Sequence, residues 1–126
     1  MKNKNMYSKS NNFQLLGIED PKQIVYELLN GLNLKLKLTI KSLDKGDIEK
    51  AKKSALKAQN IAFALRKSLD RINGGEIAQN LDLIYGHVHL ATDKFIKNNK
   101  KDLLSSALYC SAEILDGWKG LVKKIA

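Results

Sequence analysis

The sequence has 126 residues, a length that fits one domain with a buried core. It is 44% hydrophobic and 28% charged, which excludes an intrinsically disordered chain, and lysines interrupt its apolar stretches too often for a membrane span. Lysine and arginine number 22 against 13 acidic residues, for a net charge of +9, but only Arg66 and Arg71 are arginines.

One proline and one cysteine narrow the class of protein further. No proline follows Pro21, whereas β-rich folds need frequent turns with proline and glycine, so the sequence predicts an all-α fold. Cys110 alone cannot form an internal disulfide, and residues 1–12 lack the apolar stretch of a signal peptide. We therefore expect a globular protein of the cytoplasm.

Residues 1–19 are polar apart from a few large apolar side chains. They show little helical periodicity, so one interpretation is a disordered tail. The other is a mobile arm that docks its apolar residues on the body of the protein. The residues of such an occluding arm would be Tyr7, Phe13 and Leu16.

The first helix is predicted over residues 21–45. Asp20 suits the N-cap and Pro21 the first helical position. Between Leu32 and Ile40 apolar and polar residues alternate, as in a half-buried strand. A helix is favoured because a strand of this length would be unusual and because most of the apolar residues fall on one helical stripe. The stripe consists of Val25, Leu28, Leu29, Leu32, Leu36, Ile40 and Leu43.

The second helix is predicted over residues 48–72, after a turn in which Gly46 ends one helix and Asp47 caps the next. Its apolar residues are spaced alternately three and four apart, which is the a/d spacing of left-handed bundle packing. They are Ile48, Ala51, Ala55, Ala58, Ala62, Leu65, Leu69 and Ile72. The small alanines let a neighbouring helix approach closely.

Two further helices are predicted over residues 76–98 and 102–125. The core stripe of the third helix is Ile77, Leu81, Ile84, Val88, Ala91 and Phe95. That of the fourth is Leu104, Ala107, Leu108, Ser111, Leu115, Trp118, Val122 and Ile125. Because the loops are short, sequential helices must be antiparallel, so residues 20–126 are predicted to form an up-down-up-down four-helix bundle behind the arm of residues 1–19.

The sequence offers no combination of residues for metal binding or catalysis. His87 and His89 are two positions apart and point about 200° away from each other on a helix, so they cannot share a metal ion. Cys110 has no histidine nearby on its own helix to activate it. Gly74 and Gly75 lack the strand and the lysine of a phosphate-binding loop. We expect no metal, no cofactor and no enzymatic activity.

The positive charge raises nucleic-acid binding as an alternative. The lysines are spread over every predicted helix and mixed with acids, and their densest group is Lys35, Lys37 and Lys41. Arginine, the main reader of guanine edges, is nearly absent. A hydrated lysine surface that attracts an acidic partner therefore explains the charge better than nucleic acid does.

Several large apolar residues lie away from the core stripes. They are Ile24, Leu34, Leu38, Leu56, Phe63, Leu83 and Leu90. One interpretation makes them the boundary of a wide core. The other makes them a groove that binds another amphipathic chain, since a bundle helix otherwise keeps its outer face polar.

Five stretches of the sequence resemble one protein family, in the same order along the chain. They are Asp20–Gly31 (DPKQIVYELLNG), Gly46–Ala51 (GDIEKA), Gly74–Leu81 (GGEIAQNL), Leu83–Tyr85 (LIY) and Trp118. In these motifs the sequence resembles the flagellar secretion chaperone family FliS, collinearly over residues 7 to about 122.

The resemblance implies a cytosolic helical bundle that binds the C-terminal segment of newly made flagellin. Such a chaperone keeps flagellin from polymerising early and delivers it to the flagellar export gate, in some cases with a co-chaperone. The tyrosine that the family carries near its N-terminus corresponds best to Tyr7. A divergent chaperone for another flagellar protein is the alternative within the family.

Overall fold

The computed structural model describes residues 21–70 and 72–125, and the side chains of residues 22–70 and 72–119. It contains helices α2 (Pro21–Asp44), α3 (Ile48–Lys67), α4 (Gly75–Asn98) and α5 (Leu104–Ile125). The predicted arm, with Tyr7, Phe13 and Leu16, lies outside the described residues, as does the predicted cap Asp20.

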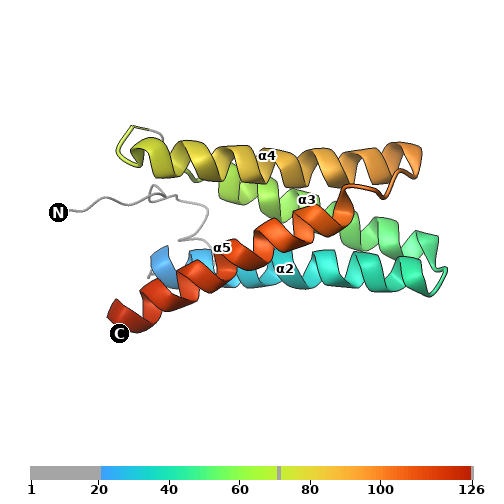
Figure 1. The fold of residues 1–126 in the computed structure, drawn as a ribbon, viewed down its shortest axis with the longest axis horizontal. Coiled ribbons are helices and arrows are strands. Elements are labelled where there is room, and N and C mark those ends of the chain that lie inside the picture. The colour runs from blue at the N-terminus through green and yellow to red at the C-terminus, as the bar shows by residue number, and fades with distance from the viewer. Residues whose placement is uncertain (1–20, 71, 126) are drawn as a thin grey trace.

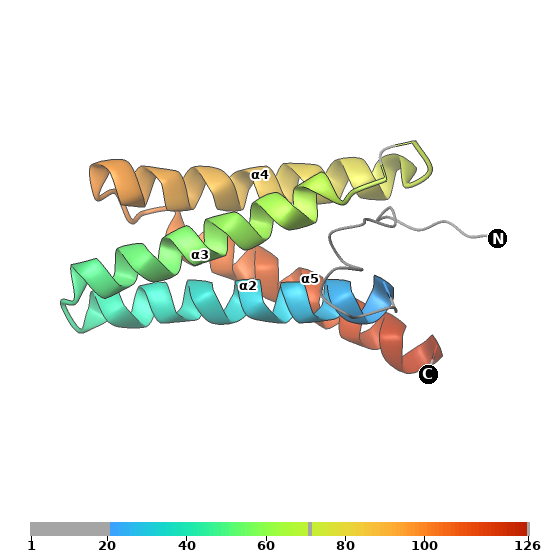
Figure 2. The same ribbon diagram turned by 180° about the vertical axis from the view of Figure 1, so that it is seen from behind.

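The four helices form the predicted antiparallel bundle. Helix α3 packs against α2 and α4, and α5 packs against the same two helices from the other side (Figure 1). Seen from behind, α3 lies between α2 and α4 along most of its length (Figure 2). The all-α up-down-up-down prediction is therefore confirmed.

The turn between α2 and α3 has the residues that its geometry requires. Gly46 has a φ of 80°, in the left-handed region that glycine tolerates best. The carboxylate of Asp47 accepts a hydrogen bond of 3.1 Å from the backbone N–H of Lys50 and so caps α3. Both residues act as their sequence positions predict.

Helix α3 ends at Lys67, five residues before the predicted end, so that part of the prediction is wrong. Asp70 instead stabilises the loop that follows the helix. Its carboxylate accepts hydrogen bonds of 3.0 Å from both the backbone N–H and the side-chain amide of Asn73. The same bonds, chiefly the backbone one, lower the pKa of Asp70. Ile72 is 91% exposed in this loop and takes no part in the core.

The alanine stripe of α3 forms the centre of the bundle. Ala51, Ala55, Ala58 and Ala62 are almost completely buried, and Leu65 and Leu69 extend the same cluster. Ile48, at the first position of the predicted stripe, is exposed because it begins the helix at the end of the bundle.

The core stripe of α4 differs from the predicted one. Its buried residues are Ala78, Tyr85, Val88, Ala91, Thr92 and Phe95. Ile77 is exposed and Ile84 only partly buried, because the helix is rotated so that positions 78, 85 and 92 face the core. Tyr85, with no exposed surface, is the largest core residue that the predicted stripe omits.

Helix α5 begins at Leu104, two residues later than predicted, because residues 102 and 103 form a turn. Its buried residues Leu104, Ala107, Ser111, Leu115 and Trp118 follow the predicted stripe. The side chains of Val122 and Ile125 lie outside those described.

Two polar contacts join α5 to α2. The hydroxyl of Ser111 donates to Oδ1 of Asn33 over 3.1 Å in the core, and the indole N–H of Trp118 donates to the carbonyl of Lys22 over 3.1 Å. Within the described part of the chain, every buried side-chain nitrogen and oxygen has a hydrogen-bond partner. None of the described helices combines the length and the apolar character that crossing a membrane requires.

Candidate interaction surface

The two histidines lie in different environments. Nε2 of His87 is 2.7 Å from the hydroxyl of Ser106 on α5, whereas His89 lies beside α3. Among the described residues there is no cluster of three or more histidine, cysteine or acidic side chains that could hold a metal ion.

Five of the seven predicted groove residues are exposed. Relative exposure is 54% for Leu34, 49% for Leu56, 61% for Phe63, 71% for Leu83 and 46% for Leu90. Leu38 is partly buried.

The exposure expected for Ile24 is wrong, since only 3% of the residue is accessible. Ile24 precedes Gly31 by seven residues and so lies on the same face of α2. That face is directed at α3, because a Cβ atom on Gly31 would lie 3.5 Å from Cδ1 of Ile61. Ile24 therefore does not contribute to an open groove.

Four of the exposed residues lie on two helices that pack against each other. Leu56 and Phe63 are seven residues apart on α3, and Leu83 and Leu90 are seven apart on α4, so each pair lies on one side of its helix. Helices α3 and α4 pack against each other, and we call the surface formed by these four side chains the α3–α4 face. Leu34 lies apart from it, on α2.

Polar bridges between the two helices lie next to these apolar residues. Nε of Arg66 is 2.7 Å from Oδ1 of Asp82, and Nη2 is 3.4 Å from Oδ2. Gln59 donates to Thr92 and Asp93 over 3.4 and 3.5 Å. These bonds hold α3 against α4 and fix the side chain of Arg66.

Gly86, inside α4, lies beneath the side chain of Arg66. A Cβ atom on Gly86 would lie 3.6 Å from Nη1 of Arg66, so the guanidinium passes directly over this position. In the sequence, this position is marked by an isolated glycine inside a helical pattern, which often has a packing reason. The pattern of apolar residues alone did not indicate the site.

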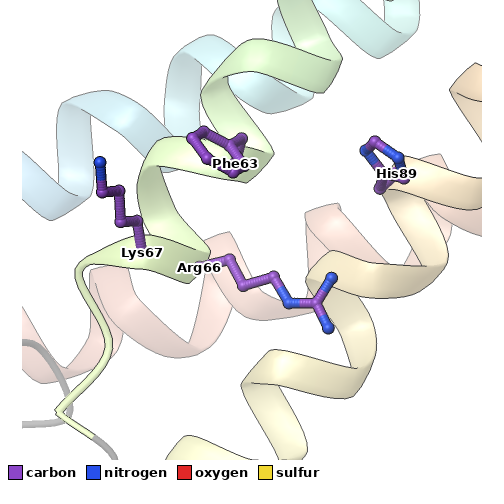
Figure 3. Close-up of a pocket in the computed structure, with 4 residues that line it drawn as sticks. All are labelled: Phe63, Arg66, Lys67 and His89. Atoms are coloured by element: carbon purple, nitrogen blue, oxygen red, sulfur yellow. The ribbon is translucent and has the colours of Figure 1, made fainter.

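A pocket of about 510 Å³ opens beside the bridge, lined by Phe63, Arg66, Lys67 and His89. Figure 3 shows Phe63 between Lys67 and His89, with the side chain of Arg66 reaching from α3 toward α4. The ammonium of Lys67 is 5.9 Å from the centre of the Phe63 ring, within the range of a cation–π contact. The pocket thus combines one aromatic wall with basic side chains.

Comparison with known proteins adds one finding. A family model described as "Flagellar protein FliS" matches residues 3–125, which is nearly the whole chain. A search of curated proteins gave no match.

Proposed function

Because the chain belongs to the FliS family, the non-enzymatic flagellin export chaperones of flagellar assembly, we propose that it binds the C-terminal segment of flagellin on the α3–α4 face. The observation that carries this assignment is the exposure of Leu56, Phe63, Leu83 and Leu90 on two helices packed side by side. We place this binding in the cytoplasm, before export.

The mechanism is burial of apolar surface. A segment that is disordered alone folds as an amphipathic helix when it covers an apolar groove, and coupled folding of this kind buries on the order of 1,000–3,000 Å². The apolar surface that flagellin subunits would use to associate is then covered by the chaperone. Premature polymerisation is blocked without any covalent step.

The N-terminal arm is the proposed regulator of this surface. Its apolar residues Tyr7, Phe13 and Leu16 would cover the α3–α4 face when the client is absent. The apparent affinity for the client then falls by the fraction of time that the arm occupies the surface. Removal of residues 1–19 should therefore raise the apparent affinity for the client.

The export gate and a co-chaperone are the further partners that we propose. A partner that binds while the client is present needs a surface outside the α3–α4 face. Leu34, exposed on α2, with the partly buried Leu38 one turn later, offers such a surface. A client other than flagellin is the alternative within the family.

The test is calorimetric titration with the C-terminal segment of flagellin. We expect Phe63→Asp and Leu90→Asp each to weaken binding by about tenfold or more, because exposed anchors of an interface carry most of its energy. Ile72→Asp is the matched control, since it places the same charge on a residue that is 91% exposed outside the α3–α4 face. Circular dichroism should show unchanged helicity in all three variants.

The proposal is overturned if neither the full chain nor a chain lacking residues 1–19 binds the segment. Equal effects of Phe63→Asp and Ile72→Asp would move the binding site elsewhere. Steep salt dependence of binding to RNA or DNA, with no binding to flagellin, would favour the nucleic-acid alternative.

A further inference from the structure

The basic pocket next to Phe63 has a composition that burial of an apolar helix does not explain. Arg66, Lys67 and His89 surround a space of about 510 Å³ with one aromatic side chain in its wall. An amphipathic client that used only apolar contacts would gain nothing from three basic groups there. We propose that the pocket binds a side-chain carboxylate, Asp or Glu, of the client segment, next to the residue that packs on Phe63. This inference rests on the proposed function.

Among the described residues, the charge around the pocket is only partly balanced. Arg66 is paired with Asp82. The nearby acidic residue Asp93 is engaged by Lys97 over 3.3 Å and by Gln59. Within the described part of the chain no carboxylate forms an ion pair with Lys67. A carboxylate supplied by a partner would therefore meet an excess of positive charge.

The position of the basic residues argues against a purely structural role. Lysine in the last turn of a helix is favoured by the helix dipole, which explains Lys67 at the end of α3. It does not explain His89, which is exposed in the middle of α4. Side chains from two different helices line one space, on either side of Phe63, and both can donate a hydrogen bond to a carboxylate.

The side chain of Arg66 is already fixed before a client arrives. Its bonds to Asp82 and its passage over Gly86 hold the guanidinium in one place, and Phe63 is held beside Lys67. Preorganised groups lose little conformational freedom on binding. The pocket therefore favours a client with an acidic residue at one position rather than a generally acidic client.

The apolar residues around the pocket indicate a side chain rather than the end of the client chain. Because α3 and α4 are antiparallel and Arg66 pairs with Asp82, Leu83 lies beside the Arg66 end of the pocket, and Leu56 lies beyond its other end. A segment that covers both leucines runs along the whole pocket. A carboxylate bound between the two leucines would therefore belong to a side chain.

The experiment compares two lysines on the same helix. Lys67→Glu reverses a charge inside the pocket, and Lys57→Glu reverses one on the exposed surface of α3, away from the pocket. Both variants change the net charge equally, so long-range attraction of the client is matched. We expect Lys67→Glu to weaken binding of the flagellin segment by about 3–10-fold at 0.15 M salt, and Lys57→Glu by less than about twofold.

A double-mutant cycle then identifies the client residue. Each Asp and Glu of the segment is replaced by the corresponding amide, and a further segment carries an amidated C-terminus. We expect one Asp→Asn or Glu→Gln change in the segment to weaken its binding to the wild-type protein about threefold or more. The same change should have no such effect on binding to the Lys67→Glu variant, but should keep its effect on binding to Lys57→Glu.

The outcomes separate this inference from the proposed function. If the wild type binds the segment and Phe63→Asp weakens it, but Lys67→Glu behaves like Lys57→Glu, the carboxylate pocket is wrong and the chaperone function stands. Coupling of Lys67 to the amidated C-terminus alone would overturn the assignment to a side chain. If the wild type does not bind the segment, both proposals fail. Thermal melting of each variant verifies that it is folded.

Discussion

Individual glycines illustrate how a residue's conformation and surroundings decide its role. Gly46 has a left-handed backbone, with a φ of 80°, and connects α2 to α3. Gly86 lies inside α4, where glycine normally weakens a helix relative to alanine. The side chain of Arg66 passes over it, and a Cβ atom at this position would be at an ordinary contact distance of 3.6 Å from Nη1.

These two positions predict opposite effects of the same substitution. Gly86→Ala should raise the free energy of unfolding by about 0.5–1 kcal/mol, because the helix gains propensity and Arg66 can stay in place. Gly46→Ala should lower it by about 1–2 kcal/mol, because alanine is strained in the left-handed region. Urea denaturation measures both. A loss of stability in Gly86→Ala would mean that Arg66 packs more tightly against α4 than the distance indicates.

At the scale of the helix, α3 separates two kinds of surface. One face carries the buried alanines Ala51, Ala55, Ala58 and Ala62, and another carries the exposed Leu56 and Phe63. The small face lets α3 lie close between α2 and α4, as Figure 2 shows. Close packing of α3 against α4 is what brings the apolar residues and the basic pocket together.

Enlarging the small face should therefore disturb the bundle. Ala58→Leu adds three carbons to a position with no exposed surface, and overpacking of this kind costs about 1–3 kcal/mol of unfolding free energy. Lys57→Leu, on the neighbouring exposed position, is the control and should change stability by less than about 0.5 kcal/mol. Equal unfolding midpoints for the two variants would show that the bundle accommodates a larger side chain at position 58, despite the burial of Ala58.

At the scale of the whole molecule, hydrogen bonds between distant segments position α5. Ser111 and Asn33 are 78 residues apart in sequence, and Trp118 and Lys22 are 96 apart. Both contacts join α5 to α2, the helix that follows the predicted arm. They close the ring of four helices on the side opposite α3.

The core contact between these helices can be tested by removing one partner. Ser111→Ala deprives the buried Oδ1 of Asn33 of its hydroxyl donor, and an unsatisfied buried group costs about 1–3 kcal/mol. The double variant Asn33→Leu with Ser111→Ala removes both polar groups. Its loss of unfolding free energy should be smaller than the sum of the losses in the two single variants. Denaturant unfolding of the three variants measures this coupling. Additive losses would contradict a direct contact.

The sequence by itself determined the helical elements and most of the central core. The residues at Gly46 and Asp47 placed the first turn, and the regular spacing of Ala51 to Leu69 identified the buried face of α3. These features depend on helix periodicity and on local hydrogen bonds, which are properties of neighbouring residues. Motifs along the chain likewise identified the family that the family model matches.

Only the tertiary structure decided which outward residues form a surface. It buried Ile24, rotated α4 so that Tyr85 rather than Ile77 faces the core, and ended α3 at Lys67. It also brought His89 beside Phe63 to form the basic pocket. The physical reason is that periodicity defines the faces of one helix, whereas burial and pocket composition depend on how neighbouring helices are rotated and spaced. That rotation is set by contacts between residues far apart in the chain.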